Sequence, residues 1–128
     1  MSGYTHKNLK DLEDQAVKGG LSPDLEARFA QEELGSEQLG ISYQRYAPGF
    51  RQPFAHRHGE DEEIYVVIEG GGQMLLGEER VELRRLDAVR VAPETVRAFE
   101  AGPDGMTVLA VGPHSRGDAK IAQVEWPD

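Results

Sequence analysis

Two histidines and a glutamate stand at a spacing that could bind a metal ion. His56 and His58 are two residues apart, and Glu63 follows five residues later, directly before the apolar run 64–68. In a β-strand, residues i and i+2 point to the same face, so the two imidazoles can converge on one point. Neutral imidazoles hold divalent cations at about 2.0–2.1 Å, and a carboxylate from the next strand would complete a set of two histidines and one carboxylate.

Strands must position these residues, and most of the chain carries strand signals. Residues 39–46 alternate between two faces, and the run 64–68 is rich in β-branched and aromatic side chains. Turn residues separate further apolar segments, with 15 Gly and 7 Pro in the chain. The strands predicted after residue 70, where Gly70 to Gly72 allow a bulge or turn, are 73–76, 80–84, 88–92, 96–100 and 106–111. Eight or so short strands with little helix predict a β-sandwich or barrel.

The segment before residue 38 contains the predicted helix. Asn8 can cap a helix over residues 9–18, which the glycine pair 19–20 would end. Residues 22–34 are ambiguous between helix and strand. We expect one helical turn followed by a strand over about 27–33 that pairs with residues 38–46.

At 128 residues the chain is expected to form one domain. We divide it into an N-terminal helix and arm packed on the barrel (1–37), the barrel core (38–113) and a polar C-terminal tail on the surface (114–128). Near the end of the tail, Trp126 is expected to hold it in place by burial.

Charge and hydropathy exclude several classes of partner. The net charge is −9 and the isoelectric point is near 4.9, so an acidic surface would repel nucleic-acid phosphates. No apolar run approaches 18 residues, and the N-terminus lacks the apolar segment of a signal peptide. We therefore expect no nucleic-acid partner, no membrane and a cytoplasmic location.

The stretch 49–70 resembles the first motif of the cupin superfamily. Gly49, His56, His58, Glu63 and Gly70 fall on its pattern, with Gly49 one residue further from the first histidine than usual. The resemblance implies a small single-domain cupin: an all-β double-stranded β-helix, or jelly-roll barrel, that is commonly a homodimer. It also implies a divalent metal held by two histidines, a glutamate and a third histidine. The run 64–68 is apolar on both faces, so its outer face must be covered by the N-terminal helix, another sheet or a second subunit.

The second cupin motif is altered at the position of the third histidine. Its best register runs from Leu86 to Ala101 and places Arg97 where the histidine ligand belongs. Two unit charges 4 Å apart interact by about 4 kcal/mol at an effective dielectric near 20, so a divalent cation and a close Arg97 repel each other strongly. Three alternatives remain: Arg97 swings away, pairs with Glu63 in a metal-free pocket, or binds a substrate carboxylate or phosphate.

The favoured hypothesis is a cupin that binds a small, anionic molecule in a pocket built on His56, His58 and Glu63. Arg97, Tyr65 and Gln44 are the further candidates for ligand contact, and one divalent Fe, Mn, Ni or Zn ion is the candidate cofactor. The alternative is a metal-dependent enzyme of the dioxygenase, isomerase or decarboxylase type. A metal-free structural or regulatory dimer is the third hypothesis. The sequence leaves open whether the protein is an enzyme.

Overall fold

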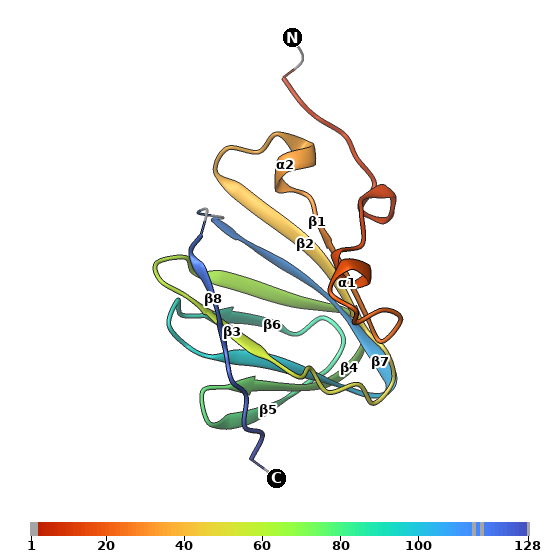
Figure 1. Ribbon diagram of the computed structural model, residues 1–128, viewed down its shortest axis with the longest axis vertical. Coiled ribbons are helices and arrows are strands. Elements are labelled where there is room, and N and C mark those ends of the chain that lie inside the picture. Colours follow the sequence, from red (N-terminus) through yellow and green to blue (C-terminus); the bar gives the residue numbers. More distant parts are fainter. Residues whose placement is uncertain (1–2, 114, 116, 128) are drawn as a thin grey trace.

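The computed structural model describes residues 3–113, 115 and 117–127, and it is an all-β barrel, as the sequence predicted. Its strands are β1 Leu25–Phe29, β2 Leu39–Tyr46, β3 Ala55–His58, β4 Glu63–Leu76, β5 Glu79–Leu83, β6 Ala88–Val91, β7 Arg97–Pro113 and β8 Ala119–Ala122. The helices are η1 Leu9–Asp11, α1 Gln15–Lys18 and α2 Gln31–Leu34, each at most one turn long. The helical segments lie at the N-terminal end of the chain, outside the curled sheet (Figure 1).

One antiparallel sheet curls on itself to form the barrel. Its hydrogen-bonded order is β1-β2-β7-β3-β8, and β4 pairs with β5, β6 and β7. The long strand β7 therefore pairs with β2, β3 and β4 and connects the two faces of the barrel (Figure 1). Because β3, β4 and β7 meet in this way, residues 56–63 and 97 are brought together.

The sequence predicted two pairs of short strands where the structure has two long ones. The segments 64–68 and 73–76 are both part of β4, and 96–100 and 106–111 join in β7. β4 bends through register shifts at 67/69 and 70/72 instead of turning back, as the bulge alternative allowed. Gly70 permits the bend, because its φ is +68° and a Cβ there would lie 2.0 Å from the carbonyl oxygen of Gly105.

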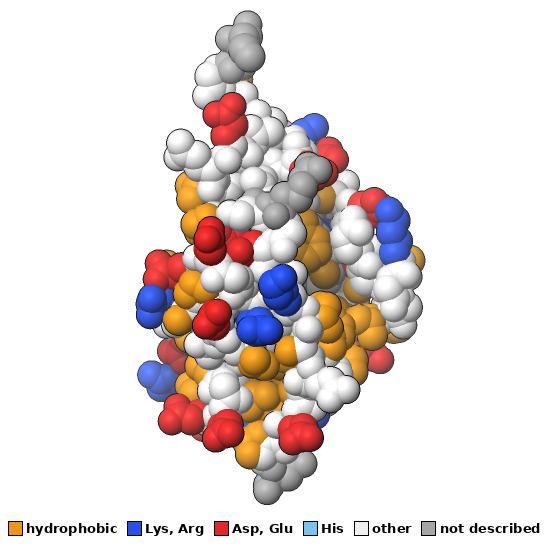
Figure 2. Space-filling model, turned by 60° about the vertical axis from the view of Figure 1, so that its left-hand side comes forward, with side chains coloured by type: hydrophobic (Ala, Val, Ile, Leu, Met, Phe, Trp, Pro, Cys, Tyr) orange, Lys and Arg blue, Asp and Glu red, His pale blue; other side chains and the backbone are white. Residues whose placement is uncertain are grey.

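The core lies inside the barrel and follows the period-two alternation of β4. Tyr65 and Val67 are each 1% exposed, whereas Ile64 on the other face is 44% exposed. Phe99 packs against Tyr46 and Tyr65 with ring centroids 5.3 and 5.2 Å apart. Exposed hydrophobic side chains lie between charged ones on the face drawn in Figure 2. The second subunit expected over the outer face of β4 stays a prediction.

The N-terminal segment differs from the predicted continuous helix. Asn8 caps it as expected and accepts a hydrogen bond from the Lys10 amide, but the helix stops at Asp11 and a new turn begins at Gln15. Asp14 causes the restart, since its carboxylate caps α1 through the Ala16 amide and also bonds the Ala27 amide of β1. Within residues 22–34 the strand comes first and the helical turn second, the reverse of the expected order. The predicted pairing with residues 38–46 is correct.

The C-terminal tail contributes a strand to the sheet, which the sequence did not predict. β8 pairs antiparallel with β3, with His58 opposite Ala119 and His56 opposite Ile121. Trp126 packs on a small cluster formed by Ala55, Leu75 and Ala98, and the guanidinium groups of Arg51 and Arg80 lie 5.1 and 5.6 Å from its ring centre. Across the described residues, no helix is long and apolar enough to cross a membrane.

Candidate functional site

One carboxylate oxygen is the centre of the predicted site. The Oε1 atom of Glu63 lies 3.0 Å from His58 Nε2, 3.4 Å from His56 Nε2, 2.8 Å from Arg97 Nη1 and 2.5 Å from the Tyr65 hydroxyl. We call these five residues the Glu63 cluster. The structure thus brings together His56, His58, Glu63, Arg97 and Tyr65, five of the six residues selected from the sequence.

Strand geometry explains why these side chains converge. His56 and His58 alternate with the exposed Arg57 on β3, and Glu63 and Tyr65 occupy the inward face at the start of β4. On β7, Arg97 stands directly opposite His56 in the antiparallel register, so the two side chains share a face. Glu62 points outward and pairs with Arg90 at 2.5 Å. Because residues two apart on a strand share a face, Glu63 points inward with Tyr65, whereas its acidic neighbour Glu62 does not.

Arg97 is fully buried, and its guanidinium is held on several sides. Nη1 donates to Glu63, Nε donates to the Thr95 carbonyl at 2.9 Å, and Nη2 donates to the carbonyls of Ala92 and Pro93 at 2.7 and 3.0 Å. Charged hydrogen bonds of this kind fix both position and orientation. Of the three alternatives for this residue, the structure has the one in which it pairs with Glu63.

The pKa values of the cluster follow from burial and from these contacts. Burial by itself would raise the pKa of the Glu63 carboxyl, but hydrogen bonds from His56 and Tyr65 and the proximity of His58 outweigh it and lower the pKa to about 2. Burial, together with the Glu63 charge, raises the pKa of Tyr65 well above its usual value. At neutral pH the cluster therefore contains an ionised Glu63 and a neutral Tyr65 that donates to it.

A cavity of about 240 Å³ opens beside the cluster. Its walls are mostly apolar and come from β1, β2, β3, β7 and β8, with Phe54 and the exposed Ile121 among the residues that line it. Glu63, His56 and His58 form a polar patch in this wall. Of the predicted ligand contacts, Gln44 lines the cavity, whereas Tyr65 and Arg97 do not.

A hydrogen-bonded ladder on β2 forms a second polar part of the wall. Tyr46 donates to Gln44 at 2.8 Å, and Gln44 donates to the Ser42 hydroxyl at 3.0 Å. All three residues line the cavity. The alternation of 42, 44 and 46 in the sequence marks their common face, but only the fold shows that this face points into the barrel.

Sequence reasoning missed two aspartates on the other side of His58. The Nδ1 atom of His58 lies 3.2 Å from Asp118 Oδ2, and the carboxylate of Asp61 is close to both. Asp61 belongs to the acidic run 60–63 and stands two residues before Glu63. That spacing was the sequence signal that could have indicated it. Asp118 had no signal, because it lies 60 residues from His58 and approaches it only through the pairing of β8 with β3.

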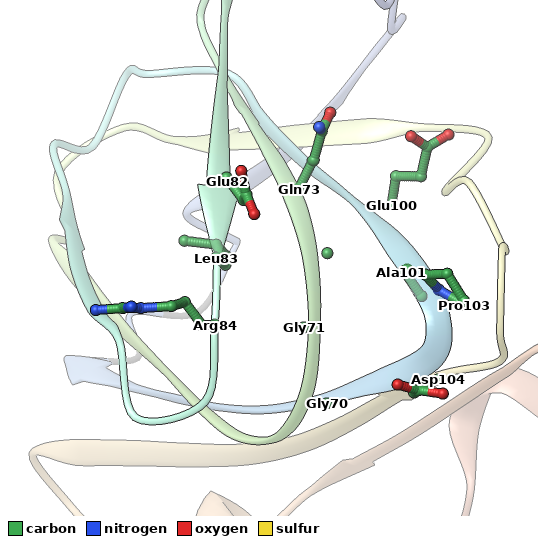
Figure 3. Close-up of a pocket in the computed structure, with 12 residues that line it drawn as sticks. Gly70, Gly71, Gln73, Glu82, Leu83, Arg84, Glu100, Ala101, Pro103 and Asp104 are labelled. Carbon is green, nitrogen blue, oxygen red and sulfur yellow. The ribbon is translucent and has the colours of Figure 1, made fainter.

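A larger hollow of about 450 Å³ lies elsewhere on the surface, along Gly70 to Gly72 and the bend of β7. Figure 3 shows that its charged side chains, among them Arg84, Glu100 and Asp104, point in different directions and do not converge. Glu100 is engaged by Arg51 and Arg80 at 2.5 and 2.9 Å. The hollow follows from close backbone packing at glycines and presents no chemical site.

The chain belongs to the cupin family. The cupin domain model matches residues 42–112, more than half of the chain, including both histidines, Glu63 and Arg97. Among curated proteins, an uncharacterized protein of Methanocaldococcus jannaschii is 32% identical over 71 residues, which span 53% of this chain and 57% of that protein. The match thus spans just over half the length of that relative. Because the relative is uncharacterized, the match gives no information about activity.

Solved structures of other proteins superpose on the fold of this chain. A cupin protein from Bacteroides fragilis superposes with a TM-score of 0.71 at 22% identity, covering 91% of this chain and 88% of that one. The polyketide cyclase RemF from Streptomyces resistomycificus gives 0.75 at 19% identity over 97% and 87% of the two chains. Oxalate decarboxylase from Bacillus subtilis gives 0.75 at 18% identity, over 97% of this chain but 34% of that one. At these identities the likeness shows the fold alone.

The distances between the ligand atoms of the Glu63 cluster suit a metal ion, but the positive charge of Arg97 does not. Ligand atoms of His56, His58 and Glu63 all lie within 4.8 Å of one another, so this group could hold an ion. However, the Arg97 guanidinium already bonds the oxygen that would bind the metal, and it is fully buried. A divalent ion about 4 Å from that guanidinium would meet a repulsion on the order of 8 kcal/mol at an effective dielectric near 20, twice that between two unit charges. As arranged here, the cluster does not fit a divalent cation.

Proposed function

We propose that this cupin barrel binds a small, mainly apolar and uncharged molecule in the 240 Å³ cavity, and that Arg97 takes the place of a metal ion beside Glu63. The proposal depends on one observation: the side chain at the third histidine position is a buried arginine bonded to Glu63 Oε1 at 2.8 Å. A fixed guanidinium supplies the positive charge that the carboxylate needs, without a cofactor.

The cavity size and its lining support a small ligand. About 240 Å³ corresponds to roughly eight water molecules at about 30 Å³ each, below the range usual for drug-sized ligands. The rings of Phe29, Phe54 and Tyr46 are among the lining groups and offer flat apolar contacts. A single ring or a short branched chain fits this space.

The charge of the wall supports an uncharged polar group on the ligand. Among the described residues that line the cavity there is no Lys or Arg, and Glu63 is the one carboxylate. Arg97 neutralises Glu63 from behind the wall but offers no contact in the cavity. The anionic ligand expected from the sequence depended on an accessible Arg97. A hydroxyl group matches the site better, since Glu63 Oε2 accepts no hydrogen bond from the described residues and can accept one from the ligand.

A matched series of small molecules tests this proposal. Benzyl alcohol, benzoate and benzylamine share one ring and differ in charge. We expect benzyl alcohol to shift the NMR signals of Gln44, His56 and Ile121 saturably, and benzoate to bind at least tenfold more weakly. Filling the cavity by Ala110→Phe should abolish the shifts, while Ile64→Phe on the outer face of β4 serves as the matched control. Tighter binding of benzoate than of the alcohol would contradict the proposal.

A metal-dependent enzyme is the second candidate, and the close approach of the His56, His58 and Glu63 ligand atoms favours it. It requires Arg97 to leave Glu63. If protein purified without a metal-affinity tag binds one equivalent of Fe, Mn, Ni or Zn with loss of the Arg97–Glu63 contact, this second candidate replaces the first.

A further inference from the structure

The buried Asp61 and the partly buried Asp118 face the side of His58 that is turned away from Glu63. His58 is 8% exposed and Asp61 is 5% exposed. The His58 Nδ1 atom and one carboxylate oxygen each of Asp61 and Asp118 lie within 4.8 Å of one another. We call these three residues the Asp61 cluster. It shares His58 with the Glu63 cluster but uses the opposite nitrogen of the ring.

The hydrogen bonds to the two carboxylates of the Asp61 cluster come from backbone amides and a hydroxyl, none of which is charged. Asp61 accepts from the amide and the hydroxyl of Ser115 at 2.7 and 2.9 Å, and Asp118 accepts from the amides of Glu60 and Asp61 at 2.9 Å each. No Lys or Arg within the described part of the chain pairs with either carboxylate. Two neighbouring carboxylates with limited access to water favour a bound cation.

The second ring nitrogen of His58 faces the same spot. Its Nε2 lies 3.0 Å from Glu63 Oε1, and a neutral imidazole that donates there carries its lone pair on Nδ1. Nδ1 is buried and has no hydrogen-bond partner among the described residues. It lies 3.2 Å from Asp118 Oδ2, close enough for the two atoms to share one ion. A histidine that donates one nitrogen to a carboxylate and offers the other as a ligand is the common arrangement at metal sites.

We propose that His58 Nδ1, Asp61 and Asp118 bind one divalent transition-metal ion, with water completing its coordination. Two ligand atoms 3.2 Å apart can each lie about 2.0–2.2 Å from a shared ion. The two carboxylates balance its charge, whereas the Glu63 cluster already contains its own cation. The ion clamps residues 59–62 to the segment that leads into β8, and it orients His58 in the cavity wall. This inference is independent of the proposed ligand.

Isothermal titration of untagged, chelator-treated protein with Zn²⁺ tests the proposal. We expect one equivalent to bind, and Asp61→Asn and Asp118→Asn each to weaken binding at least tenfold. His56→Gln, which alters the Glu63 cluster alone, and Glu62→Gln, which removes an exposed charge next to Asp61, should each leave the affinity within twofold of wild type. Failure of the wild type to bind, or loss of binding in His56→Gln but not in the aspartate variants, overturns the proposal.

A measurement on the wild type covers the case in which an aspartate variant fails to fold. Substoichiometric Mn²⁺ broadens NMR signals near the bound ion. The amide signals of Gly59, Asp61 and Ser115 should broaden first. Broadening centred on Phe54 and His56 would place the ion in the Glu63 cluster and contradict the proposal.

Discussion

The replacement of one histidine by Arg97 changes what the cupin site can do. A histidine at this position would be neutral and could donate a lone pair to a metal. The guanidinium is a permanent cation with donors only, and here it occupies the position beside Glu63 Oε1. The consequence at the residue level is a carboxylate that is paired with a fixed cation inside the barrel, while the histidines and Tyr65 bond the same oxygen.

Breaking this pair should be costly. Arg97→Leu leaves the partly buried Glu63 carboxylate without its cation, and we expect the free energy of unfolding to fall by about 3–5 kcal/mol. The exposed pair of Arg90 with Glu62, one residue earlier on the chain, is the matched control. Arg90→Leu should change stability by less than about 1 kcal/mol. Urea denaturation at pH 7 measures both, and similar losses in the two variants would contradict the role given to Arg97.

The spacing of residues predicted part of the site and missed the rest for a physical reason. His56, His58 and Glu63 share local strand periodicity, and the motif register located Arg97. Asp118 could not be found in this way, since its contact with His58 depends on long-range strand pairing. Nor could spacing decide the direction of Arg97, because pairing with Glu63 and facing a ligand differ only in the side-chain conformation.

At the scale of elements, β3, β4 and β7 carry the Glu63 cluster, and β4 and β7 each bend and continue where a turn was expected. The bend needs close backbone contact: a Cβ on Gly72 would lie 2.2 Å from the Glu100 carbonyl oxygen. Local sequence identified the apolar segments correctly. It could not show that Gly70 to Gly72 bend a strand rather than end it, because glycine permits both.

Gly70 and Gly77 have nearly the same φ but differ in how crowded they are. Substituting each by alanine therefore separates the cost of backbone strain from the cost of steric overlap. Gly70 has φ +68° and a virtual Cβ 2.0 Å from Gly105 O, whereas Gly77 has φ +65° and no atom within 4 Å. Gly77→Ala should cost about 1–2 kcal/mol from φ alone. For Gly70→Ala we expect a further loss of about 1–3 kcal/mol from overpacking. Thermal denaturation compares the variants, and equal losses would show that the crossing of β4 and β7 tolerates a side chain.

At the scale of the whole molecule, two carboxylates with lowered pKa values make stability depend on pH. The pKa of Glu63 is lowered to about 2. Burial would raise that of Glu26, but hydrogen bonds from Lys10, Arg45 and Arg28 lower it to about 2 as well. Both values lie below the ordinary 4.5, so their stabilisation is complete above pH 4.5 and is lost as the pH falls towards 2. Each contributes on the order of 3 kcal/mol.

Urea titrations between pH 7 and pH 2 measure this dependence. Stability should be flat above about pH 5 and decline below it. Glu26→Gln should lower stability most at pH 7 and converge with the wild type near pH 2, because both then lack that charge. A constant difference between the two proteins over the whole range would contradict the assignment for Glu26.

The outer face of β4 is where we expect a second copy of the chain to bind. Ile64 is 44% exposed there, on a strand whose inner face is fully packed. We expect a homodimer that covers this face, with light scattering at micromolar concentration giving twice the chain mass. Ile64→Lys should shift the population towards monomer, whereas Leu86→Lys, at another exposed apolar position, should not. A wild-type monomer would contradict the prediction.

The most direct test of the account is a crystal structure of untagged protein soaked in Zn²⁺, with anomalous diffraction recorded at the zinc edge. The account predicts no anomalous peak within bonding distance of Glu63 and an intact contact between Arg97 Nη1 and Glu63 Oε1. A zinc peak bound jointly by His56, His58 and Glu63, with Arg97 displaced, would contradict it.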